Sequence, residues 1–355
     1  MQVTVAVIRG SPKSRSPARC SPDQAIWESE RVTAASTHPD PSAGLPVCVL
    51  GLGLIGGSLL RTLHDAGRSA YGYNRSDETV AAATATGYRA STDLAATLRQ
   101  ASADNAIVVL ATPVTIIDDL LPAIVEYAAN CLLTDVISVK QAVADSVARL
   151  APGVRHVGGH PMAGTSQSGW TATDPDLFRD AMWMVTTEDH TDPDDWLAVA
   201  AIARSAGAFV VPAAAGAHDR AVAAISHLPH LTAAVTAAVG AGESDLALRL
   251  AAGSFRDGTR VAGSAPALQR AMLEANGIAL LNVLSETIDR LIAARDELRD
   301  KGTVEIVVDD GHRARSAYEQ IAGAAPAPIT GVTVGEPGWA QELRRQAHQA
   351  KVWVG

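Results

Sequence analysis

The amino-acid sequence predicts an α/β fold in two parts, a doubly wound and mostly parallel sheet followed by an all-helical domain. Two observations carry this prediction. From Leu45 onwards short apolar runs alternate with helix-length segments, a pattern typical of a parallel sheet covered on both faces. After about Ala213 the strand signal stops and long Ala-rich helical patterns follow. With 355 residues the chain is long enough for two domains.

A glycine-rich turn follows the first predicted strand, Val47–Leu50, and precedes the helical pattern Ser58–His64. In such units the first glycine allows the tight turn, the second lets the backbone approach a pyrophosphate, and the third lets the helix pack on the strand. Free N–H groups at the helix start then face the anion. The alternative is a tight turn without a ligand. We favour a dinucleotide-binding, Rossmann-type domain, whose expected cofactor contacts are Gly51, Gly53, Leu54, Ile55 and Gly56.

The remaining elements of the first part are expected in the order strand, helix, strand. The predicted strands are Ser69–Tyr73, Ala106–Leu110, Cys131–Ile137, Trp183–Thr186 and Ala208–Val211, with a helix at Ser138–Leu150 and a further strand leading into Gly159. Ligands of such sheets bind at the carboxyl ends of the strands. Thr112, Ser138 and His160 are the polar residues that fall there, and Pro113 follows Thr112.

The second part is expected to consist of long helices. Asp219–Gly240, Ser244–Gly253, Ala265–Leu298, His312–Ile321 and, weakly, Trp339–Ala350 carry helical patterns. A helix over Ala265–Leu298 would span about 45–50 Å, more than a small domain needs. Its apolar stripe, widened by Ile278 and Val283, indicates either a partner subunit or packing against the other helices.

Composition limits the function classes. The net charge of −9 carries no electrostatic footprint for nucleic acid. The three cysteines, Cys20, Cys48 and Cys131, have no metal-ligand spacing and suit a reducing compartment, so we expect no metal. No run reaches the ~18–20 continuous apolar residues of a membrane span. The sequence therefore predicts a cytoplasmic protein that binds neither nucleic acid nor a membrane.

The chain divides into four expected segments. Residues 1–44, rich in Ser, Pro and Arg, are read as a disordered extension or as the product of a start codon placed too far upstream. A dinucleotide-binding domain is expected at 45–212 and a helical substrate and dimerisation domain at 213–322. Residues 323–355 form a tail that is too short for a regulatory domain of ordinary size.

The end of the second strand bears on the choice of nicotinamide cofactor. An acidic residue about 20 positions beyond the glycines holds the ribose 2′-hydroxyl of NAD, whereas an Arg there accommodates the 2′-phosphate of NADP. The chain has Asn74, Arg75 and Ser76 at this point, with Asp77 and Glu78 close behind. This favours NADP, or the use of both cofactors, slightly over NAD alone. A solvated surface role for Arg75 is the alternative.

His160 is the candidate base. Glycines precede it and Pro161 follows it, so the backbone can approach a ligand closely. A hydride donor carbon loses its hydroxyl proton as the hydride leaves, and an imidazole suits that proton transfer near neutral pH. No lysine lies between Lys140 and Lys301, which removes the helical-domain lysine that other dehydrogenases use. A structural histidine in a glycine loop is the alternative.

A second polar group of residues lies in the helical part. Pro229 interrupts an apolar helix and implies a kink beside His227. Arg260 precedes Val261 and Ala262, so we expect it to be partly buried and suited to grip a carboxylate. For Arg256 the alternative to a carboxylate-binding role is a salt bridge to Asp257 or to another surface carboxylate. His218 and His230 are read as structural residues.

Five motifs, in order, resemble the prephenate/arogenate dehydrogenase family of tyrosine biosynthesis. The resemblance runs from about Val47 to Arg315, and its motifs are Val49–Ser58, Thr134–Lys140, Gly159–Thr165, Ile225–His230 and Phe255–Ala262. The resemblance implies that His160 is the hydrogen-bond acceptor or base for a ring hydroxyl and that Ser138 positions that hydroxyl and the nicotinamide. It implies substrate-binding roles for His227, Arg260 and Thr165.

The implied reaction is oxidative decarboxylation of prephenate to 4-hydroxyphenylpyruvate with NAD or NADP, in a homodimer built through the helical domain. Arogenate is the alternative substrate, and an inactive NAD(P)-sensing regulator is a remoter reading. Gln269 stands where some members carry an aromatic residue, which bears on the shape of the pocket. We expect any tyrosine inhibition to act at the active site.

Overall fold

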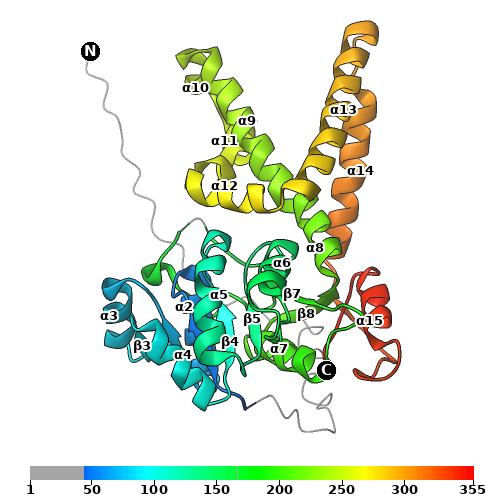
Figure 1. Ribbon diagram of the computed structural model, residues 1–355. Coiled ribbons are helices and arrows are strands. Elements are labelled where there is room, and N and C mark those ends of the chain that lie inside the picture. Colours follow the sequence, from blue (N-terminus) through cyan, green and yellow to red (C-terminus); the bar gives the residue numbers. More distant parts are fainter. Residues whose placement is uncertain (1–43, 166) are drawn as a thin grey trace, which may run out of the picture. The chain divides into compact units, whose positions relative to one another are not determined.

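A five-stranded parallel sheet forms the centre of the first domain (Figure 1). The computed structural model describes residues 44–165 and 167–355, so the expected extension at residues 1–44 lies outside the described residues except for Gly44. The strand order is β3-β2-β1-β4-β5, and each neighbouring pair is parallel. The strands are β1 Val47–Leu50, β2 Ala70–Tyr73, β3 Ala90–Ser91, β4 Ile107–Leu110 and β5 Leu133–Asp135.

Alternate residues of β1 divide between two cores, which confirms that helices cover both faces of the sheet. The helices are α2 Leu54–Asp65, α3 Asp77–Ala85, α4 Leu94–Ala103, α5 Ile117–Ala128, α6 Gln141–Leu150 and α7 Pro193–Ser205. Val47 and Val49 pack with α2, α3 and α7, whereas Cys48 and Leu50 pack with α4, α5 and α6. Cys48 and Cys131 are buried free thiols.

A second, three-stranded sheet corrects the expectation of one continuous sheet. It has the order β6-β7-β8, with β6 Gly159–Pro161 antiparallel to β7 Met182–Thr186, and β7 parallel to β8 Phe209–Ala213. His160 is therefore not at the end of a parallel strand but inside β6, opposite Met184. The chain just before β6 still lies along β5, through a bridge between Leu133 and His156.

The expected long helix at Asp219–Gly240 is divided by a π-helical turn. α8 Ala215–Val222 leads into the wide turn Ala223–His227, and α9 Leu228–Glu243 follows. Pro229 explains the turn, because it has no N–H for the α-helical bond to the Ile225 carbonyl and its ring would crowd that carbonyl. The predicted kink is present as this turn.

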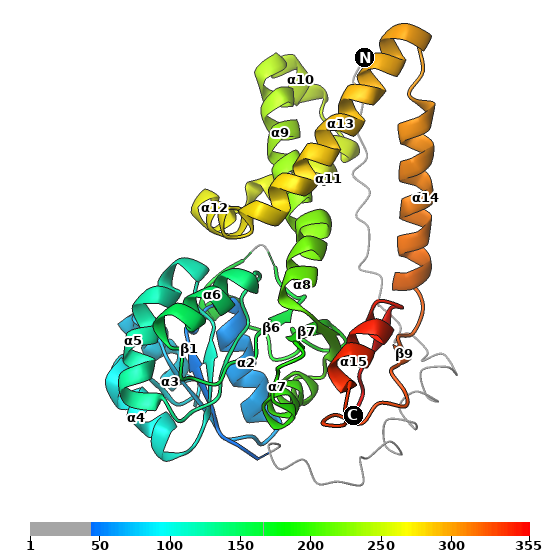
Figure 2. The same cartoon turned by 45° about the vertical axis from the view of Figure 1, so that its right-hand side comes forward.

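The expected helix at Ala265–Leu298 is two helices, because Asn276 interrupts it. α12 Pro266–Ala275 ends there and α13 Gly277–Lys301 begins after it, so the predicted 45–50 Å length was wrong. α14 Glu305–Ala322 packs against α13. Two shorter helices, α10 Asp245–Leu250 and α11 Gly253–Thr259, follow α9 (Figure 2).

The C-terminal segment packs on the first domain. β9 Ala327–Pro328 and β10 Lys351–Val352 pair, and the Trp353 N–H donates to the Val210 carbonyl at 2.8 Å. Two tryptophans, Trp339 from α15 Trp339–Ala347 and Trp353, contact the buried ring of Trp196. The tail thus completes the core around α7.

By length and composition one helical stretch in the described part of the chain, Ala215–Glu243, could cross a membrane, with 22% of its apolar window buried. One such stretch is weak evidence for a membrane span. A helix that packs against a second subunit passes the same test, and this stretch also carries the buried polar residues His218, Asp219 and His227.

Candidate active site

The glycine turn between β1 and α2 has the three roles expected of a dinucleotide cradle. Gly51 has φ +104°, and a Cβ built on it would lie 2.7 Å from the Ala111 carbonyl oxygen. A Cβ on Gly56 would lie 2.7 Å from that of Ala111, so Gly56 lets α2 pack against the sheet. Nothing lies within 4 Å of a Cβ built on Gly53. Such open space at the second glycine is what the close approach of a pyrophosphate to the backbone requires.

Two unpartnered groups beside this turn fit a bound dinucleotide. The first turn of α2, which contains Leu54 and Ile55, has neither a side-chain cap nor an acidic residue, so its N–H groups are available to an anion. The hydroxyl of Thr112, buried next to Gly51, has no hydrogen-bond partner within the protein. A buried hydroxyl of this kind calls for a ligand or water partner. Pro113 is exposed immediately after it.

The three residues that follow β2, Asn74, Arg75 and Ser76, carry no carboxylate. The side-chain oxygen of Asn74 accepts a hydrogen bond from the Leu52 N–H at 3.1 Å, so the side-chain nitrogen of Asn74 remains available as a donor. Ser76 caps α3, its oxygen accepting from the Thr79 N–H at 3.3 Å, and Arg75 is exposed. Asp77 and Glu78 form the first turn of α3, where they complement the helix dipole.

His160 ends a chain of hydrogen bonds that begins at a carboxylate. Its Nδ1 lies 2.8 Å from Nε2 of His218, and Nδ1 of His218 lies 2.8 Å from Oδ1 of Asp219. His218 and Asp219 are buried at the first helix of the second domain, while His160 is half-buried. The reading of His218 as a purely structural residue therefore missed a direct contact with the candidate base.

The charge state of this chain follows from its surroundings. Burial alone would raise the pKa of Asp219, but hydrogen bonds from His218 and from the Gln141 and Lys140 amides lower it below its ordinary value. Asp219 is thus a carboxylate. Burial, followed by the nearby His218 and Lys140, lowers the pKa of His160 well below 6.5. His160 is neutral at pH 7 and can accept a proton.

A buried ion pair fixes the backbone beside His160. The Lys140 ammonium pairs with the Asp135 carboxylate, and it donates to the Gly159 carbonyl at 2.6 Å. Asp135 also lies 3.2 Å from the His156 ring. Burial lowers the pKa of Lys140 while Asp135 opposes that shift, and Lys140 and His156 lower the pKa of Asp135 despite its burial. The chain carrying Ser138, two residues before Lys140, is tied to β6 in this way.

Two further predicted residues flank this centre. Ser138 is half-buried and lies in the loop between β5 and α6; the predicted helix start at Ser138 was wrong, since α6 begins at Gln141. Thr165 is exposed in the loop after β6, where its hydroxyl accepts from the Gln167 N–H at 3.2 Å.

His227 lies in the interior at the end of the π-helical turn, with no exposed surface. The Asn276 amide nitrogen donates to the Asp219 carbonyl at 2.8 Å and lies 3.0 Å from Nδ1 of His227. An amide nitrogen only donates, so Nδ1 of His227 accepts and Nε2 carries the proton. That Nε2 is buried and has no partner in the protein. Burial lowers the pKa of His227 to about 4, so the ring is neutral.

Arg260 corrects a second expectation, because its side chain is exposed rather than partly buried. It begins a 3₁₀ turn, Arg260–Gly263, after α11. Burial and the neighbouring Arg260 lower the pKa of His230, which places these two residues close together. Arg256 has the salt bridge that was the alternative to a ligand role, since its Nε lies 3.2 Å from Asp257 Oδ1.

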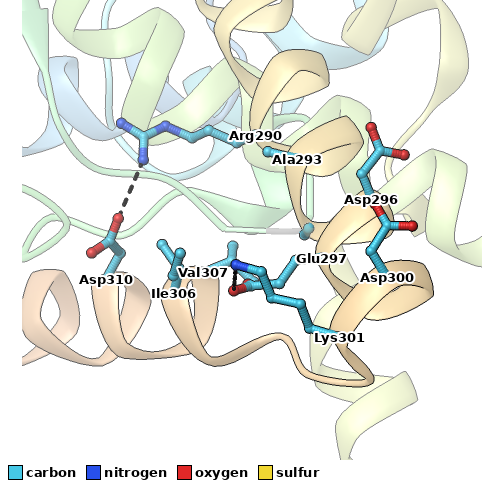
Figure 3. Close-up of a pocket in the computed structure, with 10 residues that line it drawn as sticks. Arg290, Ala293, Asp296, Glu297, Asp300, Lys301, Ile306, Val307 and Asp310 are labelled. Carbon is cyan, nitrogen blue, oxygen red and sulfur yellow. Dashed lines mark ion pairs between the residues drawn. The ribbon is translucent and has the colours of Figure 1, made fainter.

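One pocket in the described part of the chain lies away from this chemistry. It has a volume of 460 Å³ and lies between α13 and α14, where Arg290, Lys301 and Ile306 are among its lining residues (Figure 3). Both cations in it have carboxylate partners: Arg290 pairs with Asp310 and Lys301 with Glu297. No group of three or more metal-ligating side chains occurs among the described residues.

Family models match both domains of the chain. A model for the nucleotide-binding domain of prephenate dehydrogenase matches residues 59–211, and one for the dimerisation domain matches residues 214–308. The chain belongs to the prephenate dehydrogenase family. It is an oxidoreductase with a Rossmann-type NAD(P)-binding domain followed by a helical domain.

Relatives of known structure agree with this assignment. A putative prephenate dehydrogenase of Corynebacterium glutamicum is 44% identical, with a TM-score of 0.82 over 87% of this chain and 98% of that one. Prephenate dehydrogenase of Aquifex aeolicus, solved with hydroxyphenyl propionate and NAD+, is 25% identical, with a TM-score of 0.69 and coverage of 77% and 98%. Synechocystis arogenate dehydrogenase is 31% identical, with a TM-score of 0.65 and coverage of 77% and 99%.

A curated relative agrees as well. Prephenate dehydrogenase of Bacillus subtilis is 33% identical over 252 residues, which cover 68% of this chain and 67% of that protein.

Several residues around His160 escaped sequence reasoning. Asp135, Lys140, Asp219 and Asn276 are buried polar residues that tie its surroundings together. Two weak sequence signals could have pointed to Asp219 and Asn276. One is a His-Asp pair at the start of the helical part, and the other is an Asn-Gly pair, Asn276-Gly277, inside a helical pattern.

Because the space around Gly53 is open, we predict that a small side chain there weakens cofactor binding without affecting folding. Gly53→Ala should leave the thermal midpoint unchanged, because φ of −77° suits Ala and no atom is near. It should weaken NAD(P) binding about tenfold, or ~1.4 kcal/mol, by intruding on the pyrophosphate. Calorimetric titration measures the affinity. Gly56→Ala is the matched control and should lower the thermal midpoint; equal NAD(P) affinity for Gly53→Ala and the parent protein would contradict the cradle.

Proposed function

We propose that the protein is a prephenate dehydrogenase, which oxidatively decarboxylates prephenate to 4-hydroxyphenylpyruvate in tyrosine biosynthesis in the cytoplasm. The observation that carries this proposal is a neutral and half-buried His160 whose ring is hydrogen-bonded to His218. It lies in the domain that also contains the dinucleotide cradle. The Bacillus relative and the Aquifex structure, with its hydroxyphenyl ligand and NAD+, support it.

The proposed chemistry begins with a proton transfer at His160. When bound, the dinucleotide accepts the hydride from the ring carbon that bears the hydroxyl group. Nε2 of His160 takes the hydroxyl proton as the hydride leaves, and Ser138 orients that hydroxyl. The opposite ring carbon then loses CO2, its electron pair makes the ring aromatic, and the proton returns from His160 to the oxygen. Aromatisation drives the step.

The remaining site residues are proposed to bind and orient the substrate. Nε2–H of His227, buried and unpartnered, is a donor of the kind that a substrate oxygen satisfies. Arg260 is proposed to grip a carboxylate, with His230 beside it and Thr165 in the loop above β6. Arogenate keeps the same ring, hydroxyl and carboxylates, and the Synechocystis relative makes it the second candidate.

For the cofactor we propose NADP, or the use of both nicotinamide nucleotides. Asn74 and Arg75 are available as donors at the end of β2, and the nearest carboxylates, Asp77 and Glu78, belong to the first turn of α3. We also propose that the chain divides into a dinucleotide-binding domain at 45–212, a helical substrate and dimerisation domain at 213–322 and a tail at 323–355.

Steady-state assays with prephenate or arogenate, each with NAD or NADP, test the proposed function. Prephenate should be the better substrate. His160→Asn should lower turnover by about two to four orders of magnitude, the range for loss of a general base. His348, exposed after α15, provides the matched control, since His348→Asn should leave turnover unchanged. Turnover of His160→Asn within threefold of the parent enzyme would remove His160 from the mechanism, and preference for arogenate would select the second candidate.

Arg260 should act mainly in binding. Arg260→Gln removes the paired N–H donors for a carboxylate, so KM for prephenate should rise at least tenfold (~1.4 kcal/mol) with a smaller change in kcat. Arg256→Gln, four residues earlier and paired with Asp257, should leave KM unchanged. An unaltered KM in Arg260→Gln would exclude that arginine from the substrate site.

We further propose that two copies associate through the helical domain. Large apolar side chains lie exposed along α9 and α13, among them Ile278 at 87%, Val239 at 70% and Leu281 at 63% exposure, and this surface continues on α14. The alternative of intramolecular packing leaves these side chains uncovered. The matching family model for residues 214–308 describes a dimerisation domain.

Disrupting this apolar surface should produce monomers. Ile278→Asp with Leu281→Asp places two charges where an apolar interface would exclude water, and light scattering after size exclusion should show half the mass of the parent protein. Val125→Asp is the control, because Val125 is an exposed apolar residue on α5 of the first domain. An unchanged mass in the double variant would contradict the proposed interface.

A further inference from the structure

We propose that His218 and Asp219 are positioning residues that fix which nitrogen of His160 carries the proton. This inference rests on the proposed role of His160 as the base. It concerns two buried residues of the helical domain.

The hydrogen-bond partners determine the proton positions one after another. Asp219 is a carboxylate and only accepts, so Nδ1 of His218 donates to it at 2.8 Å. In the neutral imidazole form that donates through Nδ1, Nε2 carries the lone pair and is an acceptor. Nδ1 of His160, 2.8 Å away, must donate to that nitrogen. The lone pair of His160 is therefore on Nε2.

Asp219 is itself held in one orientation from three sides. Its two carboxylate oxygens accept from the N–H groups of Lys140 and Gln141, each at 2.9 Å, at the start of α6. Its backbone carbonyl accepts from Asn276. The carboxylate therefore cannot turn away from His218 without leaving the N–H groups at the start of α6 unpaired.

His160 has several charged or polar neighbours, but its ring is hydrogen-bonded to the His218–Asp219 pair. Lys140, Asp135 and His227 also act on His160 electrostatically. Lys140 donates to the Gly159 carbonyl and to Asp135, and His227 is bonded to Asn276. Among the described residues, His218 is the one that hydrogen-bonds to the His160 ring.

The chain contains a natural control for this arrangement. His64 and Asp65 are a second His-Asp pair, 3.4 Å apart, with 57% and 53% of their side chains exposed. His218 and Asp219 show 4% and 7%. The same residues in the same order thus occur once in solvent and once behind the candidate base.

Two substitutions of His218 separate positioning from structure. In His218→Gln the amide oxygen can still accept from Nδ1 of His160, whereas His218→Met fills the space without a comparable acceptor. We expect His218→Met to lower kcat about 10- to 100-fold, with KM and NAD(P) affinity unchanged, and His218→Gln to restore most of kcat. His64→Gln and His64→Met should both match the parent enzyme.

A measurement on the parent protein does not depend on how the variants fold. Nitrogen-15 NMR of the histidine rings should show the proton on Nδ1 in both His160 and His218. A proton on Nε2 of His160, or equal kcat for folded His218→Met and His218→Gln, overturns the proposal. If the parent enzyme oxidises neither prephenate nor arogenate, the proposed function fails, while the NMR result still decides the positions of the protons.

Discussion

The buried carboxylate of Asp219 is the group on which the geometry of the site depends. It belongs to the first helix of the second domain, yet its oxygens accept hydrogen bonds from the N–H groups of Lys140 and Gln141 at the start of α6 in the first domain. A carboxylate at a helix N-terminus is favoured by the unpaired N–H groups and the helix dipole, by about 0.3–1 kcal/mol and up to ~2 kcal/mol when partly buried. The same carboxylate orients His218. One side chain thus connects the two domains and sets the direction of the imidazole chain.

A second buried charge supports the same region from the other side. Lys140 and Asp135 are an ion pair without exposed surface, and such a pair is a weak source of stability because both ions lose their hydration. Removing one partner of such a pair costs about 3–5 kcal/mol, since the other is left uncompensated. The value of the pair here is geometric: the ammonium also binds the Gly159 carbonyl. The loop with Ser138 and the strand with His160 are therefore held in one arrangement.

Sequence reasoning succeeded where a local pattern has one physical explanation. Val47–Leu50 is apolar at every position because both faces of β1 are covered, and the glycine spacing predicts the turn that follows. The buried Cys48 and the kink near Pro229 follow in the same way. The role of His160 as the base, inferred from its glycine and proline neighbours, from the absence of a nearby lysine and from the family resemblance, stays a prediction.

It failed where tertiary contacts decide. Asn276 ends α12 because its amide bonds the Asp219 carbonyl and His227, partners about 50 residues away in the chain. The direction of β6 and the packing of Trp353 on Trp196 have no local signature either. His218 was read as structural because an isolated histidine in a helix is usually so, and its contact with His160 arises only when the two domains meet. The exposure of Arg260 likewise depends on what covers the helical domain, not on the apolar residues after it.

The π-helical turn has a local cause and a tertiary consequence. In an α-helix continuous from Ala215 to Glu243, Pro229 would leave the Ile225 carbonyl unbonded and crowded. The wider turn Ala223–His227 removes that conflict and brings His227 into the interior beside Asn276. Turns of this kind cost helix hydrogen bonds and are frequent at functional sites. The proline that looks like a helix breaker in the sequence therefore brings His227, with its buried and unpartnered Nε2–H, into the interior of the protein.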